Sequence, residues 1–380
     1  MTGTPATVYR EPVPTADELI GPAAVAGLID SLSEAAPGLA LPALRAAATS
    51  LEGAGLRQRN DALRDALLAD LPASYGDFEQ VVRAALKDPG FTGWMIWPVT
   101  EAAAARALES PDPAAFEHVL ALLADLTPRL TAEFALRQLL NADLDRALAV
   151  VTPWTAHPDE HVRRLASEGT RPRLPWAVRV RPLADRPEAT LPILDALYRD
   201  PSDYVRRSVA NHLNDLSHTS PEVAVRTATT WAAAPDARTQ KVIRHAMRTL
   251  VKKGHPEALA LLGFAPPASL VVSGPVLDSA AVSVGGELLF EVTLTNGSAA
   301  ETRLAIDYVI HYRKANGSTA PKVFKLTTRT LAPGQTSVIS RRHSFKVITT
   351  RTFHPGEHAV EIQVNGVSQG SAPFTLTTRA

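Results

Sequence analysis

The residues best suited to chemistry in this sequence lie in one short stretch. Residues 157–176 read HPDEHVRRLASEGTRPRLPW and place Glu168 between two pairs of arginines and ahead of a tryptophan, Trp176. A fixed carboxylate can stabilise a developing cation and orient an attacking water molecule. An indole ring attracts a cation over its face, and guanidinium groups pair with phosphates. The stretch therefore combines a candidate catalytic carboxylate with candidate phosphate-binding residues.

A helix is expected to position Glu168. It should begin after Pro158, with two carboxylates in its first turn, where they suit the positive end of the helix dipole, and it should end at Gly169. At 100° per residue, Arg164 and Glu168 share one flank of this helix, one turn apart. An exposed pair of this kind contributes only about 0.2–0.5 kcal/mol, so Glu168 can also be an ordinary surface charge.

The pattern around Arg164 returns twice. Val205-Arg206-Arg207 repeats Val162-Arg163-Arg164 after 43 residues, and Val242-Ile243-Arg244 follows after another 37. Periods of about 40 residues are typical of HEAT-type solenoids, whose stacking aligns equivalent positions. In register, Arg164, Arg207 and Arg244 form one row, Glu168, Asn211 and Arg248 form the next, and Asp215 lies beside them. The sequence therefore predicts a concave wall that is basic overall and holds carboxylates inside it.

Composition sets the broad class of the protein. The chain has 380 residues, a hydrophobic fraction of 45% and no cysteine, so we expect two domains, and disulfides and thiolate chemistry are excluded. The formal net charge is zero, so a case for nucleic acid binding must rest on local clustering. No apolar run has the length of a signal-peptide core or a membrane span. We expect a cytoplasmic protein.

From Ala16 to about Leu262 the sequence is rich in alanine and leucine and predicts successive helices. Apolar residues recur at i, i+3, i+4 and i+7, and Pro, Gly, Asp or Ser stands between the segments. The predicted helices include Pro22–Leu32, Leu41–Leu51, Gln58–Leu71, Phe78–Leu86, Thr100–Leu108, Pro113–Leu122, Thr131–Leu139 and Leu144–Val150. Short connections between them favour an α-solenoid or an irregular bundle.

The composition changes after residue 265, where Val, Thr and Gly replace Ala and Leu and the apolar period drops to two. Strands are predicted at Leu289–Leu294, Leu304–His311, Val323–Thr328, Ser337–Ser340, Phe345–Ile348, His358–Val364 and Phe374–Thr378. Turn signals stand between them at Asn296-Gly297, Asn316-Gly317, Pro333-Gly334 and Asn365-Gly366. We therefore predict an all-α HEAT-like repeat domain at residues 1–265 and an all-β immunoglobulin-like sandwich at residues 268–380, with Pro266-Pro267 as the linker.

A family resemblance rests on the string WTAHPDEHVRRLASEGTRPRLPWA, with TAEFALRQLL before it and ANHLNDLS after it. The chain resembles the AlkC branch of the alkylpurine DNA glycosylases, which are built from HEAT-like repeats. The match is strongest over Thr131–Leu216, about a quarter of the chain, and ASEG-x-RPRLPWA is long and specific. Helical repeats followed by an immunoglobulin-like domain also match the AlkC members that carry this extension.

The resemblance implies a monofunctional glycosylase of base excision repair, which removes cationic N-alkylated bases such as 3-methyladenine from duplex DNA without flipping them. The positions that match the catalytic motif are Glu133, Glu168, Trp176 and Asp215, with Asn214 as the alternative to Asp215. The positions that match the backbone-contact cluster are Arg163, Arg164, Arg171 and Arg173. The resemblance implies no metal and no organic cofactor, and we expect a monomer.

The chemistry of a cationic base explains why carboxylates would be needed. A base alkylated at a ring nitrogen already carries positive charge, so its glycosidic bond is weak and the leaving group needs no proton. A fixed anion would stabilise the oxocarbenium-like sugar and position water. A tryptophan such as Trp176 could stack on the cation, worth roughly 0.5–2 kcal/mol. Each residue also has an ordinary explanation: Trp176 as core, Asp215 as a turn residue, and Glu133 as a helix-face charge.

The predicted sandwich is locally basic. Its cations are Arg313, Lys314, Lys322, Lys325, Arg329, Arg341, Arg342, Lys346 and Arg351. They could form a second DNA clamp, through a tip near Arg313–Thr319 or through Arg341-Arg342, or the lysines could only blunt sheet edges.

Histidine and tryptophan pairs elsewhere in the sequence have simpler explanations. His157 and His161 are four residues apart, but Pro158 keeps the first outside the helix, and metal binding is not expected. Trp94 and Trp97 are expected in the core. The rival functions are a non-catalytic HEAT scaffold for protein partners and a DNA-binding repeat protein without activity. The arginines and carboxylates favour DNA over a protein groove, which would show more aromatic and methionine anchors.

Overall fold

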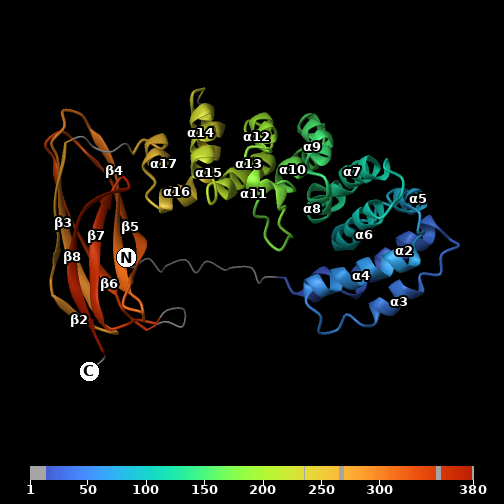
Figure 1. Ribbon diagram of the computed structural model, residues 1–380, viewed down its shortest axis with the longest axis horizontal. Helices are drawn as coiled ribbons and strands as arrows, with labels where there is room; N and C mark the ends of the chain where they lie inside the picture. Colours follow the sequence, from blue (N-terminus) through green and yellow to red (C-terminus); the bar gives the residue numbers. More distant parts are fainter. Residues whose placement is uncertain (1–13, 235, 265–268, 348–351, 379–380) are drawn as a thin grey trace, which may run out of the picture. The chain divides into compact units, whose positions relative to one another are not determined.

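The computed structural model describes residues 14–234, 236–264, 269–347 and 352–378. Contacts between Cα atoms group the chain into two units, Met1–Asp215 and Leu216–Ala380. Helices come first and strands follow (Figure 1), so the predicted fold class, an all-α region followed by an all-β sandwich, is confirmed. The predicted boundary between residues 265 and 268 stays a prediction, because the linker Pro266-Pro267 lies outside the described residues.

The first unit consists of helices joined by short connections. In chain order they are α1 (Ala16–Leu19), α2 (Pro22–Ala35), α3 (Pro42–Ala48), α4 (Leu56–Asp70), α5 (Tyr75–Ala85), α6 (Ile96–Leu108), α7 (Ala115–Leu126), α8 (Glu133–Ala142), α9 (Leu144–Val151), α10 (Glu160–Glu168), α11 (Pro182–Asp185), α12 (Leu191–Leu197) and α13 (Asp203–Leu216). The 3₁₀ turns η1 (Gly93–Met95), η2 (Thr127–Arg129) and η3 (Thr152–Ala156) lie between some of them. Each predicted helix coincides with one of these helices, with shifts of a few residues at the ends.

Helix α6 is the clearest case of a shifted boundary. It begins at Ile96, whereas the sequence pattern predicts a start at Thr100. Pro98 lies in the first turn of the helix, where a proline without an N–H removes no intrahelical hydrogen bond. The helix can therefore start before its proline.

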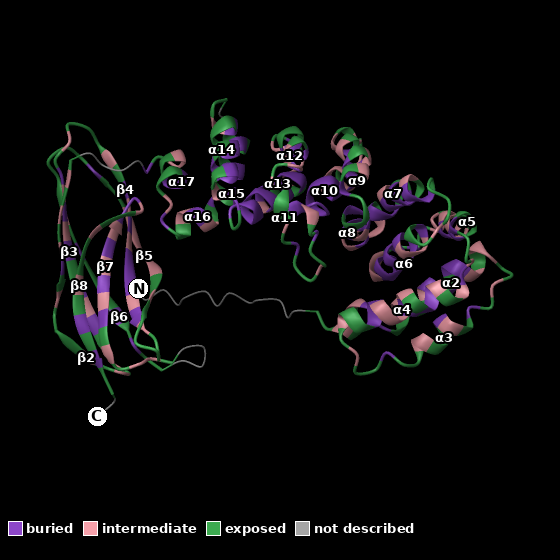
Figure 2. Cartoon of the chain, in the orientation of Figure 1, coloured by how far each residue is buried: buried purple, intermediate pink, exposed green. Residues whose placement is uncertain are grey.

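Buried residues form a stripe along most helices of the first unit (Figure 2). Leu136, Leu139 and Leu140 of α8 are fully buried. Helix α6 contacts both α4 and α8, and its first nine residues are all buried. Burial of each large aliphatic side chain contributes about 1.5–3 kcal/mol, so α6 and α8 form the stable centre on which the candidate site is built.

The second unit holds the last helices and the strands. The helices are α14 (Pro221–Ala232), α15 (Ala237–Ala246), α16 (Arg248–Lys252) and α17 (Pro256–Leu261). The strands are β1 (Leu270–Leu277), β2 (Ala281–Ser283), β3 (Glu287–Asn296), β4 (Thr302–Arg313), β5 (Thr319–Leu331), β6 (Thr336–Ser344), β7 (Gly356–Val364) and β8 (Val367–Thr377). They form a three-stranded sheet, β1-β3-β6, and a five-stranded sheet, β2-β8-β7-β4-β5.

Alternating side chains of the two sheets build the sandwich core. On β3, Leu288, Phe290, Val292 and Leu294 are buried, and every second residue of β4 and β7 joins them. The predicted strands at 289–294, 304–311, 323–328, 337–340, 358–364 and 374–378 fall on β3 to β8, with β8 ending at Thr377.

Three strand assignments differ from the prediction. The sequence did not reveal β1, in which Pro275 lacks a ladder donor and lies at a register shift between Ser273 and Val276, nor the short β2. The strand predicted at Phe345–Ile348 is wrong for its described residues: Phe345 is buried in the core but lies beyond the end of β6.

The predicted turns lie between strands. Asn296-Gly297, Asn316-Gly317 and Pro333-Gly334 stand at or beyond strand ends, and Asn365-Gly366 joins β7 to β8. Asn365 and Gly366 have φ of +49° and +77°, which a two-residue hairpin turn of this kind requires. A Cβ at Gly366 would lie 1.8 Å from the carbonyl oxygen of Gly254, so this glycine also lets the turn between α16 and α17 approach the hairpin.

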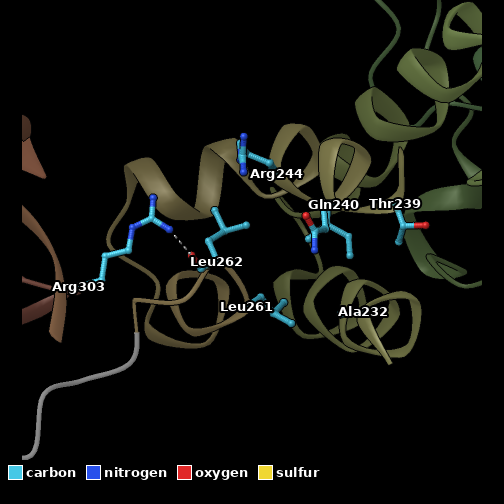
Figure 3. Close-up of a pocket in the computed structure, with 8 residues that line it drawn as sticks. Ala232, Thr239, Gln240, Arg244, Leu261, Leu262 and Arg303 are labelled. Carbon is cyan, nitrogen blue, oxygen red and sulfur yellow. Dashed lines mark hydrogen bonds between the residues drawn. The ribbon is translucent and has the colours of Figure 1, made fainter. Parts of the chain in front are cut away.

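Arg303 of β4 makes a second contact between the helices and strands of this unit. Its guanidinium lies 4.4 Å from the centre of the Phe264 ring and donates to the carbonyl of Leu262 at 3.5 Å. Figure 3 shows the pocket beside it, of about 340 Å³, which is lined by Ala232, Thr239, Gln240, Ile243, Arg244, Leu261, Leu262 and Arg303.

Candidate active site

Glu168 is the last residue of α10, as the sequence predicts. Asp159 caps the start of this helix, and its Oδ1 accepts a hydrogen bond from the N–H of His161 at 2.7 Å. At the other end, a Cβ on Gly169 would lie 2.5 Å from Cδ2 of Leu136 in α8. The glycine therefore allows the end of α10 to pack closely on α8, the helix that begins with Glu133.

Three carboxylates and two guanidinium groups alternate in one row at this packing contact. Arg164 is paired with Oε2 of Glu133 and lies 3.6 Å from Oε1 of Glu168. Arg171 donates to the same Oε1 of Glu168 at 2.5 Å and to Oδ2 of Asp215 at 2.8 Å. The order Glu133–Arg164–Glu168–Arg171–Asp215 is called here the carboxylate row. All five of its members are residues that the sequence singles out.

The carboxylate row is buried. Glu133, Glu168, Arg171 and Asp215 are each less than a tenth exposed. Burial alone would lower the pKa of the Arg171 guanidinium, but hydrogen bonds and charge from Asp215 and Glu168 outweigh burial and raise that pKa above its usual value. The same balance, with Glu133 and Glu168 as partners, raises the pKa of Arg164. Buried ion pairs return little net stability, so stability alone does not explain three carboxylates here.

Glu133 and Glu168 line a cleft of about 250 Å³. The other lining residues are Trp94, Trp97, Leu130, Thr131, Phe134, Arg171, Leu174, Pro175 and Trp176. Thr131 orients the first carboxylate, because its hydroxyl donates to Oε2 of Glu133 at 2.7 Å. Anionic oxygens beside aromatic rings suit a flat organic cation.

Trp176 is held outside the protein core. Its side chain is 78% exposed, so the alternative that it is a core residue does not fit. Its backbone has φ of +62°, a left-handed conformation that is unfavourable for a residue with a bulky side chain. An exposed indole in a strained backbone marks a functional position better than a packing position.

Trp94 and Trp97, which precede the site in the chain, differ in burial. Trp97 is 1% exposed and packs on Phe134 with ring centres 4.7 Å apart, so its predicted core position is confirmed. The prediction for Trp94 is wrong: Trp94 is only half-buried and lines the cleft. It follows Gly93, which has a φ of +78° at the start of η1.

The arginines predicted to contact the DNA backbone fall into two groups. Arg163 donates to both carboxylate oxygens of Asp200, at 2.7 and 3.1 Å, and to the carbonyls of residues 157 and 158. Arg163 and the row members Arg164 and Arg171 thus have protein partners in this structure, and their role in phosphate binding stays a prediction. Arg173 and Arg207 are exposed and keep that role as a prediction.

The remaining predicted DNA-contact residues lie in the second unit. Arg244 and Arg248 are exposed on α15 and α16, Arg313 ends β4 and is half-buried, and Arg341 and Arg342 are exposed on β6. Their alignment with Arg164 and Arg207 stays a prediction, because these residues belong to the other unit.

Two residues of the site were not predicted. Tyr204 at the start of α13 lies over Arg164, with the guanidinium 5.1 Å from the ring centre. Arg137 on α8 is fully buried and contacts the loop that carries Trp176. The position of Arg137, four residues after Glu133 and within an apolar helix face, was the one signal that could have identified it.

Metal ligation finds no support in the part of the chain that the structure describes. No group of three or more His, Asp or Glu residues there could hold a metal ion, and His157 instead accepts a hydrogen bond from the N–H of Asp159. Among the same described residues, no helix has the length and hydropathy of a membrane span.

Comparison with known proteins relates both parts of the chain to known families. Residues 271–378 match the family model of the C-terminal Ig-like domain of the uncharacterised protein YhaZ. The uncharacterized protein YhaZ of Bacillus subtilis is 38% identical over 261 residues, which are 69% of this chain and 72% of that protein. The structure of the Pseudomonas fluorescens alkylpurine DNA glycosylase AlkC, bound to DNA containing an abasic site analog, is 32% identical with a TM-score of 0.76, covering 96% of this chain and 100% of that one. The chain belongs to the AlkC-type family of alkylpurine DNA glycosylases that carry a C-terminal immunoglobulin-like domain.

Proposed function

We propose that this protein is a monofunctional DNA glycosylase that hydrolyses the N-glycosidic bond of cationic N-alkylated bases, of the 3-methyladenine type, in duplex DNA. The observation that carries the proposal is the carboxylate row, two carboxylates of which line a cleft beside the exposed ring of Trp176. The related AlkC structure holds DNA with an abasic site analog, and abasic DNA is what such a reaction leaves.

The proposed reaction needs an anion more than an acid. The C1′–N bond breaks with its electron pair moving onto the cationic base, which leaves neutral. The deoxyribose then carries the positive charge, and a fixed carboxylate stabilises it. Water adds to C1′ and releases a proton, which completes the hydrolysis.

Glu168 is the carboxylate that we assign to the sugar cation. Arg171 and Arg164 both approach its Oε1, whereas Oε2 accepts no hydrogen bond from any described residue. Oε2 can therefore face the cation or accept a hydrogen bond from the attacking water.

The other motif residues have supporting roles. Glu133 also lines the cleft and adds a second negative charge. Asp215 acts through Arg171, to which it is bonded at 2.8 Å, and so keeps that guanidinium fixed against Glu168. Trp176 stacks on the lesion or on the face of its sugar.

We also assign DNA binding and an unflipped lesion to this function. A tryptophan that projects from the surface can meet a nucleotide within the duplex, so the base need not enter an enclosed pocket. Arg173 and Arg207 would neutralise phosphates, and the sandwich would add a second clamp through Arg313 or through Arg341-Arg342. Replacing either Arg173 or Arg207 by Gln should lower the slope of log affinity against log salt by about one. Duplex DNA with alkylated bases would be the partner of a monomeric cytoplasmic enzyme.

The rival proposal is a non-catalytic scaffold that binds DNA or protein through the helical unit. Incubation of the purified protein with methylated duplex DNA, with released bases separated by chromatography, decides between the two. Release of 3-methyladenine supports the glycosylase. Normal binding of duplex DNA without release of any base would support the non-catalytic scaffold instead.

A further inference from the structure

The loop that carries Trp176 has no helix or strand of its own. It runs over residues 169–181, between the end of α10 and the start of α11. Connections in compact domains are typically about 4–6 residues long, and longer loops without secondary structure are usually functional. A loop of this length places Trp176 accurately only if something outside the loop fixes its backbone.

One stripe of α8 lies against this loop. Glu133, Arg137 and Asn141 are spaced four residues apart and so share a helix face. Glu133 belongs to the carboxylate row. The next two residues of the stripe bond to backbone atoms of the loop.

Arg137 binds the loop at three points. Its Nε donates to the carbonyl of Val178 at 2.5 Å, and its Nη1 donates to the carbonyls of Arg171 at 2.7 Å and Gly169 at 3.2 Å. Gly169 and Arg171 precede Trp176 in the chain and Val178 follows it. Gly169 also comes directly after Glu168. One guanidinium therefore ties the loop together on both sides of the tryptophan.

Asn141 holds the far end of the same loop. Its side-chain amide donates to the carbonyl of Arg179 at 2.9 Å and accepts from the N–H of Arg181 at 2.9 Å. With Arg137 it fixes residues 169, 171, 178, 179 and 181. Trp176 itself is mostly exposed, so its left-handed backbone must be held by these neighbours rather than by packing of its own ring.

We infer that Arg137 is a positioning residue of this enzyme, which sets the orientation of Trp176 relative to Glu168 by clamping residues 169–178. It does not touch the substrate. The inference rests on the proposed glycosylase activity for its kinetic test only.

The substitution Arg137→Lys distinguishes two possible roles of Arg137, hydrogen bonding to the loop and supplying positive charge. Burial, followed by repulsion from Arg171, lowers the pKa of Arg137 to about 10, so the guanidinium is still protonated at neutral pH. Lysine keeps the positive charge near the carboxylates but cannot donate in a planar fork to several carbonyls. A role in charge balance alone predicts that the lysine variant keeps the wild-type rate, and a clamp predicts that it is slower.

Arg59 provides the matched control. It is 2% exposed on α4, away from the cleft, and donates to the carbonyls of Ala54 at 2.8 Å and Ile20 at 2.9 Å. Arg59→Lys therefore weakens a buried clamp of the same kind without touching the site. Asn141→Ala is a milder variant of the loop clamp, should Arg137→Lys fail to fold.

The kinetic test measures single-turnover base release at saturating enzyme, together with the Kd for intact duplex. We expect Arg137→Lys to lower the rate by roughly 2- to 30-fold, up to the loss expected when the cation–π contact of Trp176 is removed outright, and Asn141→Ala to lower it less, while Kd changes less than about threefold. The Arg59→Lys rate should match wild type. A wild-type rate in a folded Arg137→Lys protein, or an equal loss in Arg59→Lys, would overturn the inference.

Two further readouts identify the route of the effect. In a double-mutant cycle, Arg137→Lys should add little to Trp176→Ala, because both remove the same contact; full additivity would contradict the clamp. Backbone hydrogen exchange over residues 170–181 should rise in Arg137→Lys and stay unchanged in Arg59→Lys. This exchange result does not depend on activity, so it tests the clamp even if wild-type protein releases no base.

Discussion

Glu101 on α6 and Glu168 on α10 are both buried glutamates of the same helical unit, with 2% and 6% of their surface exposed. Glu101 uses both of its oxygens. Arg57 donates to Oε1 at 3.1 Å and to Oε2 at 3.2 Å, Asn60 donates to Oε2 at 2.7 Å, and Trp97 donates to Oε1 at 3.3 Å. Its hydrogen-bonding capacity is largely taken up by the fold.

Glu168 differs in what its second oxygen does. Oε1 takes the contacts with Arg164 and Arg171, and Oε2 is left without a protein partner among the described residues, at the wall of a cleft. Burial and an arginine partner are thus common to both glutamates. The available oxygen beside a cleft is what distinguishes a carboxylate that can act on a substrate from one that holds helices together.

The largest effect is expected from Arg171→Leu. This change leaves Glu168 and Asp215 buried without the cation between them, and breaking a buried pair in this way costs about 3–5 kcal/mol. Base release per folded molecule should also fall by about 100-fold. Thermal unfolding and single-turnover base release measure the two losses. Wild-type base release would mean that the row does not position Glu168.

Glu101→Gln should lower the stability of the protein but not its rate of base release. Its partner Arg57 is 43% exposed, so solvent screens part of the loss, and we expect a decrease of about 1–3 kcal/mol in the free energy of unfolding. Base release per folded molecule should stay within about threefold of wild type. Urea unfolding gives the first quantity. A large loss of rate with normal stability would remove the distinction between the two glutamates.

His212 on α13 is a buried polar group of a third kind, one that stays neutral. Its ring bonds to the carbonyl of Ser167 at 2.9 Å and to the hydroxyl of Thr190 at 3.0 Å. Burial lowers its pKa from 6.5 to about 3. Between these values the unfolded chain binds the proton and the folded chain does not, so stability is full above pH 6.5 and falls as the pH falls.

Because of His212, the free energy of unfolding should fall by about 2 kcal/mol between pH 7 and pH 5. This value takes roughly 1.4 kcal/mol for each pH unit below 6.5. Chemical unfolding at several pH values measures it. The His212→Gln protein should show a flatter dependence over the same range, and an equal slope in both proteins would contradict this source of acid sensitivity.

Trp176→Ala should have the smallest effect on the fold. Because the ring is mostly exposed, the melting temperature should stay within a degree or two of wild type, as surface substitutions usually change stability by no more than about 0.5 kcal/mol. Losing a cation–π contact of about 0.5–2 kcal/mol should lower base release by roughly 2- to 30-fold. A change in melting temperature without a change in rate would assign Trp176 to structure.

Local patterns allowed much of this molecule to be predicted from sequence. The start of α10 follows from the carboxylates near its first turn, and its end at Glu168 follows from Gly169. Apolar periods of 3.6 and 2 separate the helical part from the strands. The motif around Glu168 and Trp176 indicated the site because its residues are close together in the chain.

The contacts that organise the site could not be predicted, because they join distant residues. Arg171 reaches Asp215 across 44 positions and Arg137 reaches Val178 across 41. Sequence spacing says nothing about such pairs, so the carboxylate and carbonyl partners of these arginines could not be read from the sequence. Strand β1 was missed for a local reason, since Gly274-Pro275 reads as a turn.

The most direct test compares Glu168→Gln with Asp200→Asn in single-turnover release of 3-methyladenine from methylated duplex DNA. Asp200 is also a buried carboxylate bonded to an arginine, Arg163, and it is outside the cleft, so it controls for loss of a buried charge. We predict that Glu168→Gln binds duplex DNA normally and loses about 100- to 1,000-fold in rate, while Asp200→Asn keeps the wild-type rate per folded molecule. Equal rates for wild type and Glu168→Gln would contradict the assignment of Glu168 as the catalytic carboxylate.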